Sequence, residues 1–433
     1  MCPFPTSIHR KKFIRDISLA FSGSLLIPRI LQDRRKDSPL ILIVSGWQDV
    51  NIGDIAHTPG LLHILQTFIP QAEVILWKRS NGSKAEQMLR KYFPHVKIIY
   101  GRVNADKSVD NPEITEAFKK ADIMIHGSGP AVVGQSNLEA WTKYSNKPFG
   151  IFGTTIQQVN DNLKSLLKKS LFIYTRETAS LKVLEAAGLS GKHIAFVPDA
   201  TFYMNVHDDV KANRFLSDNN LDPQKFICAI PRLRITPYYK IRPGNAGWTT
   251  ERIRQVNELN NKKKESDHAK LREAIISWVR ETGNKAVVCP EMTYEVDIMD
   301  ELLIDPLPQD VKSQVIKHGY WLPDEAASVY AKAHTILSFE CHSPIIAAAN
   351  GTPFFYLRQP EDTIKGQMYY DLGFNEWIFE IEQSSGKQIS DKLREIRGNY
   401  DQAKRKVASV MKKIDRIYDK RTGYLKDEIN IYT

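Results

Sequence analysis

Short apolar runs alternate with longer polar segments through the first half of the chain, and this alternation restricts the possible folds more than any other feature. The apolar runs, which are rich in β-branched residues, occupy 40–46, 73–78, 96–101, 122–129, 148–154, 171–176 and 194–199. The polar segments between them have the character of helices. Strands that alternate with helices predict a parallel sheet covered on both faces.

A second series of apolar runs occupies 226–233, 285–291, 334–340, 353–357 and 377–381. It predicts a second, smaller parallel sheet. The chain of 433 residues also exceeds the length, about 250–300 residues, beyond which one core usually divides. We therefore expect the α/β class, with two facing Rossmann-like domains at 37–205 and 206–385.

Three further segments flank or interrupt these domains. Residues 237–268 are polar and contain Pro and Gly, which favours an active-site flap or a mobile insertion. Residues 386–433 are expected to form a C-terminal helix that packs across the domain junction. Residues 1–36 combine a basic run with an apolar stretch, which resembles a twin-arginine export signal or a membrane-associating amphipathic helix.

The charge balance bears on the class of substrate. Lys and Arg total 60 against 50 Asp and Glu, and the net charge of +10 favours an anionic substrate or an anionic cell-envelope surface. No zinc-finger spacing occurs, and nucleic acid is not an expected partner. No acidic or histidine cluster has ligand spacing, so no metal is expected. Cys228 and Cys289 are expected to be buried thiols.

The first apolar run leads into a turn that suits a ligand, because ligands of parallel sheets bind at the carboxyl edge. Gly53 permits a tight turn into a helix, and Asp54 is expected either to cap that helix or to bind a hydroxyl group. Asn51 is expected to line the same cleft. The fourth run ends in a second ligand-permitting turn, formed by Gly127, Ser128 and Gly129.

The sixth and seventh runs end in charged residues. Arg176 stands beside the start of a helix, and the two together favour a phosphate or carboxylate. Ser180 lies in the first turn of that helix. An ion pair of Arg176 with Glu177 is the structural alternative. Asp199 is expected either to orient a basic residue in the cleft or to anchor a hinge.

A histidine stands where a strand meets a helix late in the chain. His342 and Ser343 open an Ala-rich helix that ends at Gly351. A histidine in this place suits general acid or base catalysis, because it titrates near neutral pH. Glu340 is expected on the same side of the preceding strand, where it would raise the pKa of His342 and form an acid–base pair.

Four short motifs follow one another along the chain: N-x-G-D at 51–54, R-E-x-x-S at 176–180, P-D at 198–199, and C-H-S at 341–343 with G-x-P at 351–353. Taken in this order, they resemble the motifs of the polysaccharide pyruvyl transferase family. The resemblance covers about residues 40–360. It implies a GT-B-like fold and transfer of a pyruvyl group from phosphoenolpyruvate to sugar hydroxyls, commonly as a cyclic ketal. It further implies that Arg176 holds the donor, that His342 transfers a proton and that Asp54 lines the cleft, with no cofactor beyond the donor.

One position departs from the family pattern. The last motif usually reads R-x-H, but Glu340 stands in place of the arginine. A carboxylate there would repel phosphoenolpyruvate. Either Arg232 or Arg234 compensates by binding the donor, or the donor is different.

The favoured function is a transferase that adds pyruvyl groups to a cell-surface polysaccharide or its lipid-linked precursor. The alternatives are a GT-B glycosyltransferase that uses a nucleotide sugar and an exported glycan-binding protein. The expected partners are phosphoenolpyruvate and a glycan or lipid-linked oligosaccharide, and a peripheral membrane contact stays open. The location is cytoplasmic or membrane-associated, or periplasmic if residues 1–36 direct export.

Overall fold

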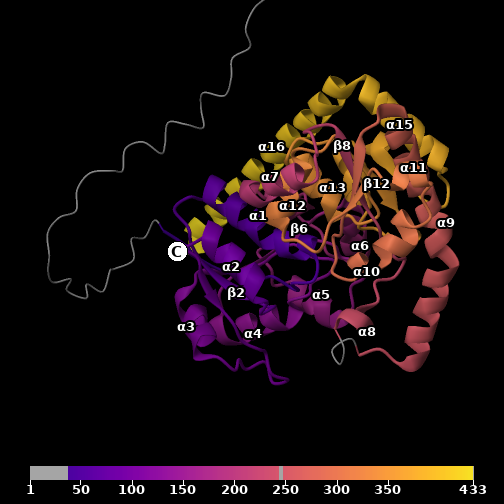
Figure 1. Cartoon of the computed structure of the whole chain (residues 1–433). Helices are drawn as coiled ribbons and strands as arrows, with labels where there is room; N and C mark the ends of the chain where they lie inside the picture. Colours follow the sequence, from indigo (N-terminus) through magenta and orange to yellow (C-terminus); the bar gives the residue numbers. More distant parts are fainter. Residues whose placement is uncertain (1–37, 243–246, 433) are drawn as a thin grey trace, which may run out of the picture. The chain divides into compact units, whose positions relative to one another are not determined.

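The computed structural model describes residues 38–242 and 247–432, so the expected export-signal-like segment lies outside the described residues. The strands form two fully parallel sheets (Figure 1). The first has the order β3-β2-β1-β4-β5-β6-β7 and the second the order β10-β9-β8-β11-β12-β13. The strands of the first sheet are β1 (Leu40–Ser45), β2 (Glu73–Lys78), β3 (Lys97–Ile99), β4 (Ile123–His126), β5 (Phe149–Thr154), β6 (Phe172–Thr175) and β7 (Ile194–Phe196). Those of the second are β8 (Phe226–Ile230), β9 (Lys285–Val288), β10 (Val315–Lys317), β11 (Thr335–Ser338), β12 (Phe354–Arg358) and β13 (Ile378–Glu380).

The expected fold class is confirmed. Every apolar run named from the sequence forms a strand, and the sequence missed only β10, a three-residue strand at the edge of the second sheet. Both sheets have doubly wound strand orders, which change direction between β1 and β4 and between β8 and β11. Ligands bind at such switch points, outside the carboxyl ends of the strands.

Helices connect the strands. They are α1 (Ile52–Phe68), α2 (Ser83–Tyr92), α3 (Pro112–Lys120), α4 (Gln135–Ser145), α5 (Asp161–Leu167), α6 (Thr178–Ala186), α7 (Asp209–Asp218), α8 (Tyr238–Ile241), α9 (Thr250–Thr282), α10 (Glu295–Met299), α11 (Gln309–Lys312), α12 (Pro323–Tyr330), α13 (His342–Ala349), α14 (Gln367–Leu372), α15 (Gly386–Gly398) and α16 (Tyr400–Tyr432). Short irregular turns are η1 (Ala200–Tyr203), η2 (Asp300–Ile304), η3 (Pro360–Asp362) and η4 (Asn375–Trp377).

Alternation along β1 shows how the first sheet is covered. Ile41 and Ile43 pack in one apolar cluster with residues of α1 and α16, whereas Leu42 and Val44 pack in a second cluster with residues of α3 and α4. Successive side chains of a strand point to opposite faces, so each face of the sheet has its own helical layer. The first cluster continues into the strands of the second sheet.

The flap or mobile insertion expected at 237–268 is largely a helix instead. From Thr250 onward this segment belongs to α9, which begins at the side-chain cap provided by Thr249. Buried Val256 in the expected flap, and Leu271 and Ile275 farther along, hold the helix against the domain. Polarity misled the sequence interpretation, because most of the helix surface faces solvent and only a narrow stripe is buried.

The last helix packs against the first half of the molecule. Asn399 ends α15 and separates it from α16, and Figure 1 shows α16 extending from α15 toward α1. The Tyr418 hydroxyl donates to the carbonyl of Asp199 at 2.7 Å, and the Tyr174 hydroxyl donates to the carbonyl of Arg421 at 3.2 Å. The helix therefore connects the C-terminal segment to the edge of the first sheet.

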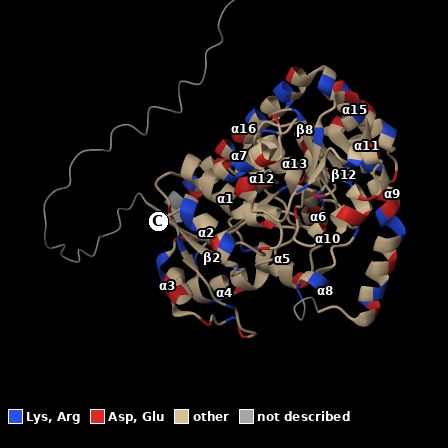
Figure 2. Ribbon diagram, in the orientation of Figure 1, with Lys and Arg blue, Asp and Glu red and all other residues tan. Residues whose placement is uncertain are grey.

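Charges of both signs are mixed on the long helices. Figure 2 shows Lys, Arg, Asp and Glu interspersed along α9 and α16, and Arg254 pairs with Glu251 and Glu258 on the surface of α9. The basic run at 262–264 lies on this same helix. Among the described helices, none has a stretch long and apolar enough to span a bilayer.

The loops at the carboxyl ends of β1 and β9 bind each other directly. The amide of Ile52 donates to the carbonyl of Glu291 at 2.9 Å, and the amide of Thr293 donates to the carbonyl of Val50 at 3.0 Å. These bonds connect the two carboxyl edges of the sheets at the place where a ligand is expected.

Candidate functional site

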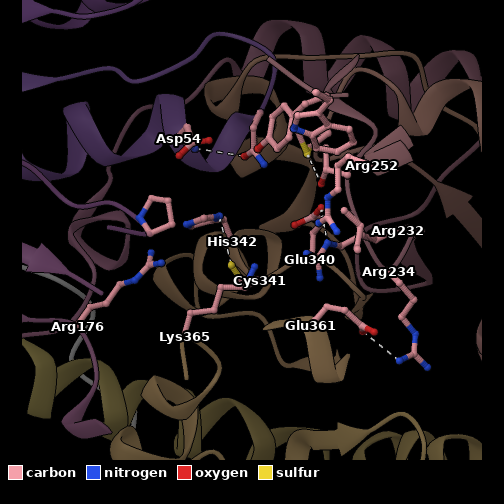
Figure 3. A pocket seen from close by; sticks show the side chains of 17 residues that line it. Asp54, Arg176, Arg232, Arg234, Arg252, Glu340, Cys341, His342, Glu361 and Lys365 are labelled. Atoms are coloured by element: carbon pink, nitrogen blue, oxygen red, sulfur yellow. Dashed lines mark hydrogen bonds and ion pairs between the residues drawn. The ribbon is translucent and has the colours of Figure 1, made fainter. Parts of the chain in front are cut away.

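A cavity of about 470 Å³ opens where the two carboxyl edges meet. Figure 3 shows side chains from both halves around it. Its lining consists of Asn51, Asp54, Pro130, Arg176, Arg232, Arg234, Ile235, Thr236, Tyr238, Trp248, Arg252, Met292, Glu340, Cys341, His342, Glu361 and Lys365. Seven residues expected at the site from the sequence are among them, so the structure brings Arg176, Arg232 and His342 together.

The turn after β1 differs from one expectation. Asp54 was expected to cap α1 or to bind a hydroxyl, but Asn51 is the cap, since its side-chain oxygen accepts from the amides of Gly53 and Asp54 at 2.6 and 3.2 Å. The carboxylate of Asp54 instead accepts from Gln48 and lines the cavity. Its oxygens are therefore available at the site.

Gly53 lies against the catalytic candidate of the other half. A Cβ at this position would stand 2.1 Å from Cγ of His342, closer than any real contact of this kind. Only the absence of a side chain lets α1 approach the imidazole so closely.

Arg176 is buried and held on two sides. Its Nε donates to the Thr155 hydroxyl at 2.7 Å, and its Nη1 donates to Asp199 at 2.7 Å. Glu177 lies 3.7 Å from the same guanidinium. Asp199 thus orients a basic residue of the cleft, one of its two expected roles.

His342 is held by an acid that the sequence analysis missed. Nδ1 of His342 lies 3.1 Å from Glu291, and the amides of His342 and Ser343 donate to the same carboxylate at 3.1 and 2.6 Å. Glu291 therefore fixes both the ring and the first turn of α13. The P-E ending of the 285–291 strand, at a carboxyl edge, was the signal available for it.

The expected acid–base pair of Glu340 and His342 does not form, because His342 pairs with Glu291. Strand β11 ends at Ser338, so the two residues do not share a strand face, and Glu340 contacts Arg232 at 3.0 Å instead. Burial raises the pKa of Glu340, while Arg232 opposes the shift.

The pKa of His342 is set by its neighbours. Burial alone would lower it, but contacts with Cys341 and with the Glu291 carboxylate raise it well above its ordinary value. Burial would raise the pKa of Asp199, but His57, then Arg176 and His342, hold it well below its usual range. These shifts favour the protonated form of the His342 imidazole and the ionised form of the Asp199 carboxyl.

Both expected donor-binding arginines of the second half are ion-paired. Arg232 contacts Glu340 and donates to Asp362 at 2.6 Å. Arg234 donates to Asp267 at 2.8 Å and to Glu361 at 3.1 Å. Their guanidinium groups are thus oriented by carboxylates rather than free in the cavity.

Several lining residues were not singled out from the sequence. Lys365 pairs with Asp362 at 2.9 Å and points into the cavity beside His342 (Figure 3). Arg252 lies over the ring of Trp248, 5.7 Å from its centroid. Tyr238 also lines the cavity. Tyr238 belongs to α8 and Arg252 to α9, while Lys365 follows η3, and the positions of these segments depend on tertiary packing.

Seven expected site residues do not line the cavity. Two of them, Gly53 and Asp199, are described above, and the groups of the other five are engaged inside the protein. Ser180 donates to Glu177 and accepts from the Ile156 amide, and Ser343 donates to Glu291 at 2.8 Å. The remaining three form the turn after β4, where the Ser128 hydroxyl bonds backbone groups of the first half: Gly127, Ser128 and Gly129.

One group of side chains has metal-ligand character. Within the described residues, ligand atoms of His57, Asp199 and His342 lie within 4.8 Å of one another. However, Arg176 donates to the very oxygen of Asp199 that faces both imidazoles. A second cation between them would be repelled by this guanidinium. We therefore interpret the group as a hydrogen-bonded network.

Comparisons with solved structures show a similar fold in a glycosyltransferase and in two proteins solved with UDP-sugars. A glycosyltransferase from Rickettsia africae ESF-5 has a TM-score of 0.56 at 14% identity, covering 90% of this chain and 98% of that one. HepE of Anabaena in complex with UDP-glucose has 0.55 at 11%, covering 90% and 98%. A UDP-GlcNAc 2-epimerase from Neisseria meningitidis has 0.54 at 12%, covering 92% and 100%. At these identities the likeness concerns the fold alone.

Sequence comparison identifies the family. A search of curated proteins found no match. The model of the polysaccharide pyruvyl transferase family matches residues 51–359, which is most of the chain and contains every cavity-lining residue except Glu361 and Lys365. The protein therefore belongs to the polysaccharide pyruvyl transferase family and is a transferase of polysaccharide modification.

Proposed function

We propose that this transferase moves a pyruvyl group from phosphoenolpyruvate to hydroxyl groups of a cell-surface polysaccharide or its lipid-linked precursor. The observation that supports this most is the convergence of Arg176, Lys365 and His342 on one side of the cavity (Figure 3). Phosphoenolpyruvate carries a phosphate and a carboxylate, and such groups are bound by arginine, lysine and imidazolium. No cofactor beyond the donor enters the proposal.

Arg232 offers a further donor contact despite its ion pairs. Its Nε and the facing oxygen of Glu340 are 3.0 Å apart, yet neither atom has a hydrogen bond of acceptable geometry. A buried donor without a partner favours an incoming acceptor. The donor phosphate or carboxylate would therefore bind Arg232 more readily if Glu340 is protonated, and burial already raises the pKa of Glu340.

The chemistry needs one acid and one base. In the first step His342 gives a proton to the methylene carbon of phosphoenolpyruvate, and the acceptor oxygen bonds to the neighbouring carbon while Asp54 takes the hydroxyl proton. In the second step another hydroxyl of the acceptor displaces phosphate from that carbon, and its proton leaves with the phosphate. A ketal and inorganic phosphate result. General acid and base groups positioned in this way contribute roughly 10²–10⁴-fold each.

The acceptor side of the cavity carries aromatic rings. Tyr238 and Trp248 line it, together with Arg252 from the start of α9. Aromatic faces offer apolar surface to a sugar ring, and their polar edges allow water nearby. Gln48 donates both to Asp54 and, at 3.5 Å, to the Tyr238 hydroxyl, so Asp54 lies near this ring, which suits a base for the acceptor hydroxyl.

Two alternatives keep the fold and change the ligand. HepE and the Neisseria epimerase were solved with UDP-glucose and UDP-GlcNAc, so a nucleotide sugar is the competing donor. A glycan-binding protein without transfer activity is the other.

Calorimetric titration of the full chain with phosphoenolpyruvate and, separately, with UDP-glucose tests the proposal. We expect phosphoenolpyruvate to bind and to lose at least about 10-fold in affinity in Lys365→Met, because a charge-assisted contact contributes about 1.5–3 kcal/mol. Lys332→Met, which removes a surface pair with Asp209, is the control and should bind normally. Binding of UDP-glucose without phosphoenolpyruvate would establish the competing donor, and release of phosphate on adding acceptor separates transfer from mere binding.

A further inference from the structure

One basic side chain of the cavity differs from the other Arg and Lys residues there. Those others each form an ion pair with a carboxylate: Arg176, Arg232, Arg234 and Lys365. Arg252 also lines the cavity but forms no such pair with any residue that the structure describes. Its guanidinium lies over the indole ring of Trp248, 5.7 Å from the ring centroid. A ring face orients a guanidinium without neutralising its charge, so this charge is available to an anionic ligand.

A second arginine of this kind lies beside the same cavity wall. Arg242 is half-buried, and its guanidinium lies 5.3 Å from the centroid of the Tyr238 ring. Its Nη2 donates to the side-chain carbonyl of Gln48, and among the described residues it meets no carboxylate. A guanidinium has five N–H groups, and Gln48 takes one of them, so several donors are left for a ligand. Tyr238 and Trp248 thus each carry a guanidinium whose charge is not neutralised.

The next arginine of α9 shows the ordinary arrangement of a surface arginine. Arg254 pairs with Glu251 and Glu258 on the surface of the helix. Helical residues two positions apart do not face the same way, so Arg252 reaches the cavity while Arg254 does not. Acids are therefore present on this part of the helix, but they pair with Arg254 and leave Arg252 without a counter-charge.

Gln48 connects Arg242 to Asp54, the proposed base for the acceptor hydroxyl. The side-chain amide of Gln48 donates to the Asp54 carboxylate and accepts from Arg242. Because a carboxylate only accepts and a guanidinium only donates, no other orientation of the amide satisfies both partners. With ordinary hydrogen-bond and amide bond lengths, the guanidinium nitrogen and the carboxylate oxygen lie about 8 Å apart at most. An anionic group at Arg242 and a hydroxyl at Asp54 can therefore belong to one sugar residue or to two linked residues.

The donor is not the expected source of this anionic group. The proposed function assigns phosphoenolpyruvate to Arg176, Lys365 and His342, and Figure 3 shows the Arg252 side chain well apart from Arg176 and Lys365. Arg242 and Arg252 instead lie against the aromatic rings that the proposed function gives to the acceptor. A neutral sugar bound there would leave both guanidinium groups without a counter-charge, whereas an acidic sugar supplies one.

We propose that the acceptor is an acidic glycan and that Arg242 and Arg252 select it. They bind an anionic group, the carboxylate of a uronic acid or a phosphate, on or next to the sugar that receives the pyruvyl group. This inference rests on the proposed function and names the class of its acceptor. The planar fork of a guanidinium matches the paired oxygens of either group. Complementary charge of this kind favours a charged acceptor over a neutral one with the same hydroxyl groups.

Calorimetric titration of the full chain with matched sugars tests the proposal. The probes are methyl glycosides of glucuronic, galacturonic and mannuronic acid, the 6-phosphates of the corresponding methyl hexosides, and the neutral methyl hexosides themselves. We expect at least one charged probe to bind about 10-fold or more tightly than its neutral partner, because hydrogen bonds to charged groups are the stronger ones. The preference should be lost in Arg252→Gln and in Arg242→Gln and should persist in the control Arg254→Gln.

The two kinds of charged probe identify the anionic group. A preference confined to the uronic acids assigns a carboxylate, and one confined to the 6-phosphates assigns a phosphate. If no charged probe binds more tightly than its neutral partner, or if the preference survives in both Arg242→Gln and Arg252→Gln, the acceptor is not selected by these arginines and the proposal is wrong.

A separate titration distinguishes this inference from the proposed function. Lys365→Met removes a cation assigned to the donor, so it should weaken the binding of phosphoenolpyruvate and leave the preference for the charged sugar unchanged. Loss of that preference in Lys365→Met would place the acidic sugar at the donor side and overturn the inference. If the wild type does not bind phosphoenolpyruvate, the proposed function fails, whereas a preference that depends on Arg252 would still establish recognition of an acidic glycan.

Discussion

The close approach of Gly53 to His342 allows a perturbation whose size follows from the structure. In Gly53→Ala the new Cβ would lie 2.1 Å from Cγ of His342, while ordinary contact begins at 3.4 Å. The helix α1 and the imidazole must then separate by about 1.3 Å, and misplacements near 1 Å cost catalysis about 100-fold. The fold should change less, because overpacking costs about 1–3 kcal/mol and the better helix propensity of alanine offsets about 1 kcal/mol of it.

The assay is release of inorganic phosphate from phosphoenolpyruvate in the presence of acceptor, with the midpoint of thermal unfolding measured in parallel. Gly101→Ala is the control, since its Cβ would meet Cδ1 of Ile114 at 2.4 Å, away from the cavity. It should lose stability comparably and keep its kcat. If Gly53→Ala keeps kcat within about threefold of the wild type, the ring position does not limit the reaction and the reasoning from misplacement is wrong.

Three further predictions concern charge. A general acid works only while protonated, so kcat should fall as pH rises through the raised pKa of His342. The variant Glu291→Gln removes a carboxylate that helps to raise this pKa. In the variant, the fall of kcat at high pH should therefore occur at a lower pH than in the wild type. Asp199→Ala should lower the free energy of unfolding by about 3–5 kcal/mol, because it leaves the buried charge of Arg176 unpaired, which denaturant titration measures. Treatment with a chelator should leave the transfer rate unchanged, and a loss that Zn²⁺ restores would contradict our interpretation of the histidine network.

The depressed pKa of Asp199 gives stability a defined dependence on pH. The pair it forms with Arg176 and His57 stabilises the fold above the ordinary carboxylate pKa, and this contribution is lost as pH falls through the much lower pKa of the folded state. His342 acts in the opposite sense. Its raised pKa contributes stability that is complete below the ordinary histidine value and is lost as pH rises through the folded value.

The sequence predicted the sheets because their strands are apolar on both faces. In β1 and β8 every residue is buried, so the runs remain visible without any knowledge of their neighbours. The edge strand β10 is three residues long and only partly buried, and it carries no such signal. Helix α9 was misread because its apolar residues form a thin stripe in a polar segment.

The sequence predicted site residues only in segments that follow the end of an apolar strand. Arg176 directly follows β6, Asp54 and His342 lie in the first turns of the helices that come after β1 and β11, and all three line the cavity. Glu291 also follows a strand, but nothing in the chain shows that it meets a histidine 51 residues away. His57 lies inside a helix that is buried along most of its length, where a histidine is usually structural, and its contact with His342 depends on the second half of the chain.

The exchange of arginine for Glu340 becomes intelligible from the neighbouring strand. Strands β8 and β11 are adjacent and parallel, so the residues that follow them stand side by side at the carboxyl edge. Arg232 follows β8 and contacts Glu340 after β11, so the edge keeps one guanidinium although the motif position has lost its own. A second arginine at 340 would face Arg232 in a buried site and repel it. With Glu340 at the motif position, the positive charge at this edge is therefore that of Arg232, after the neighbouring strand. Arg232 is available to bind an anion only when the carboxyl group of Glu340 is protonated.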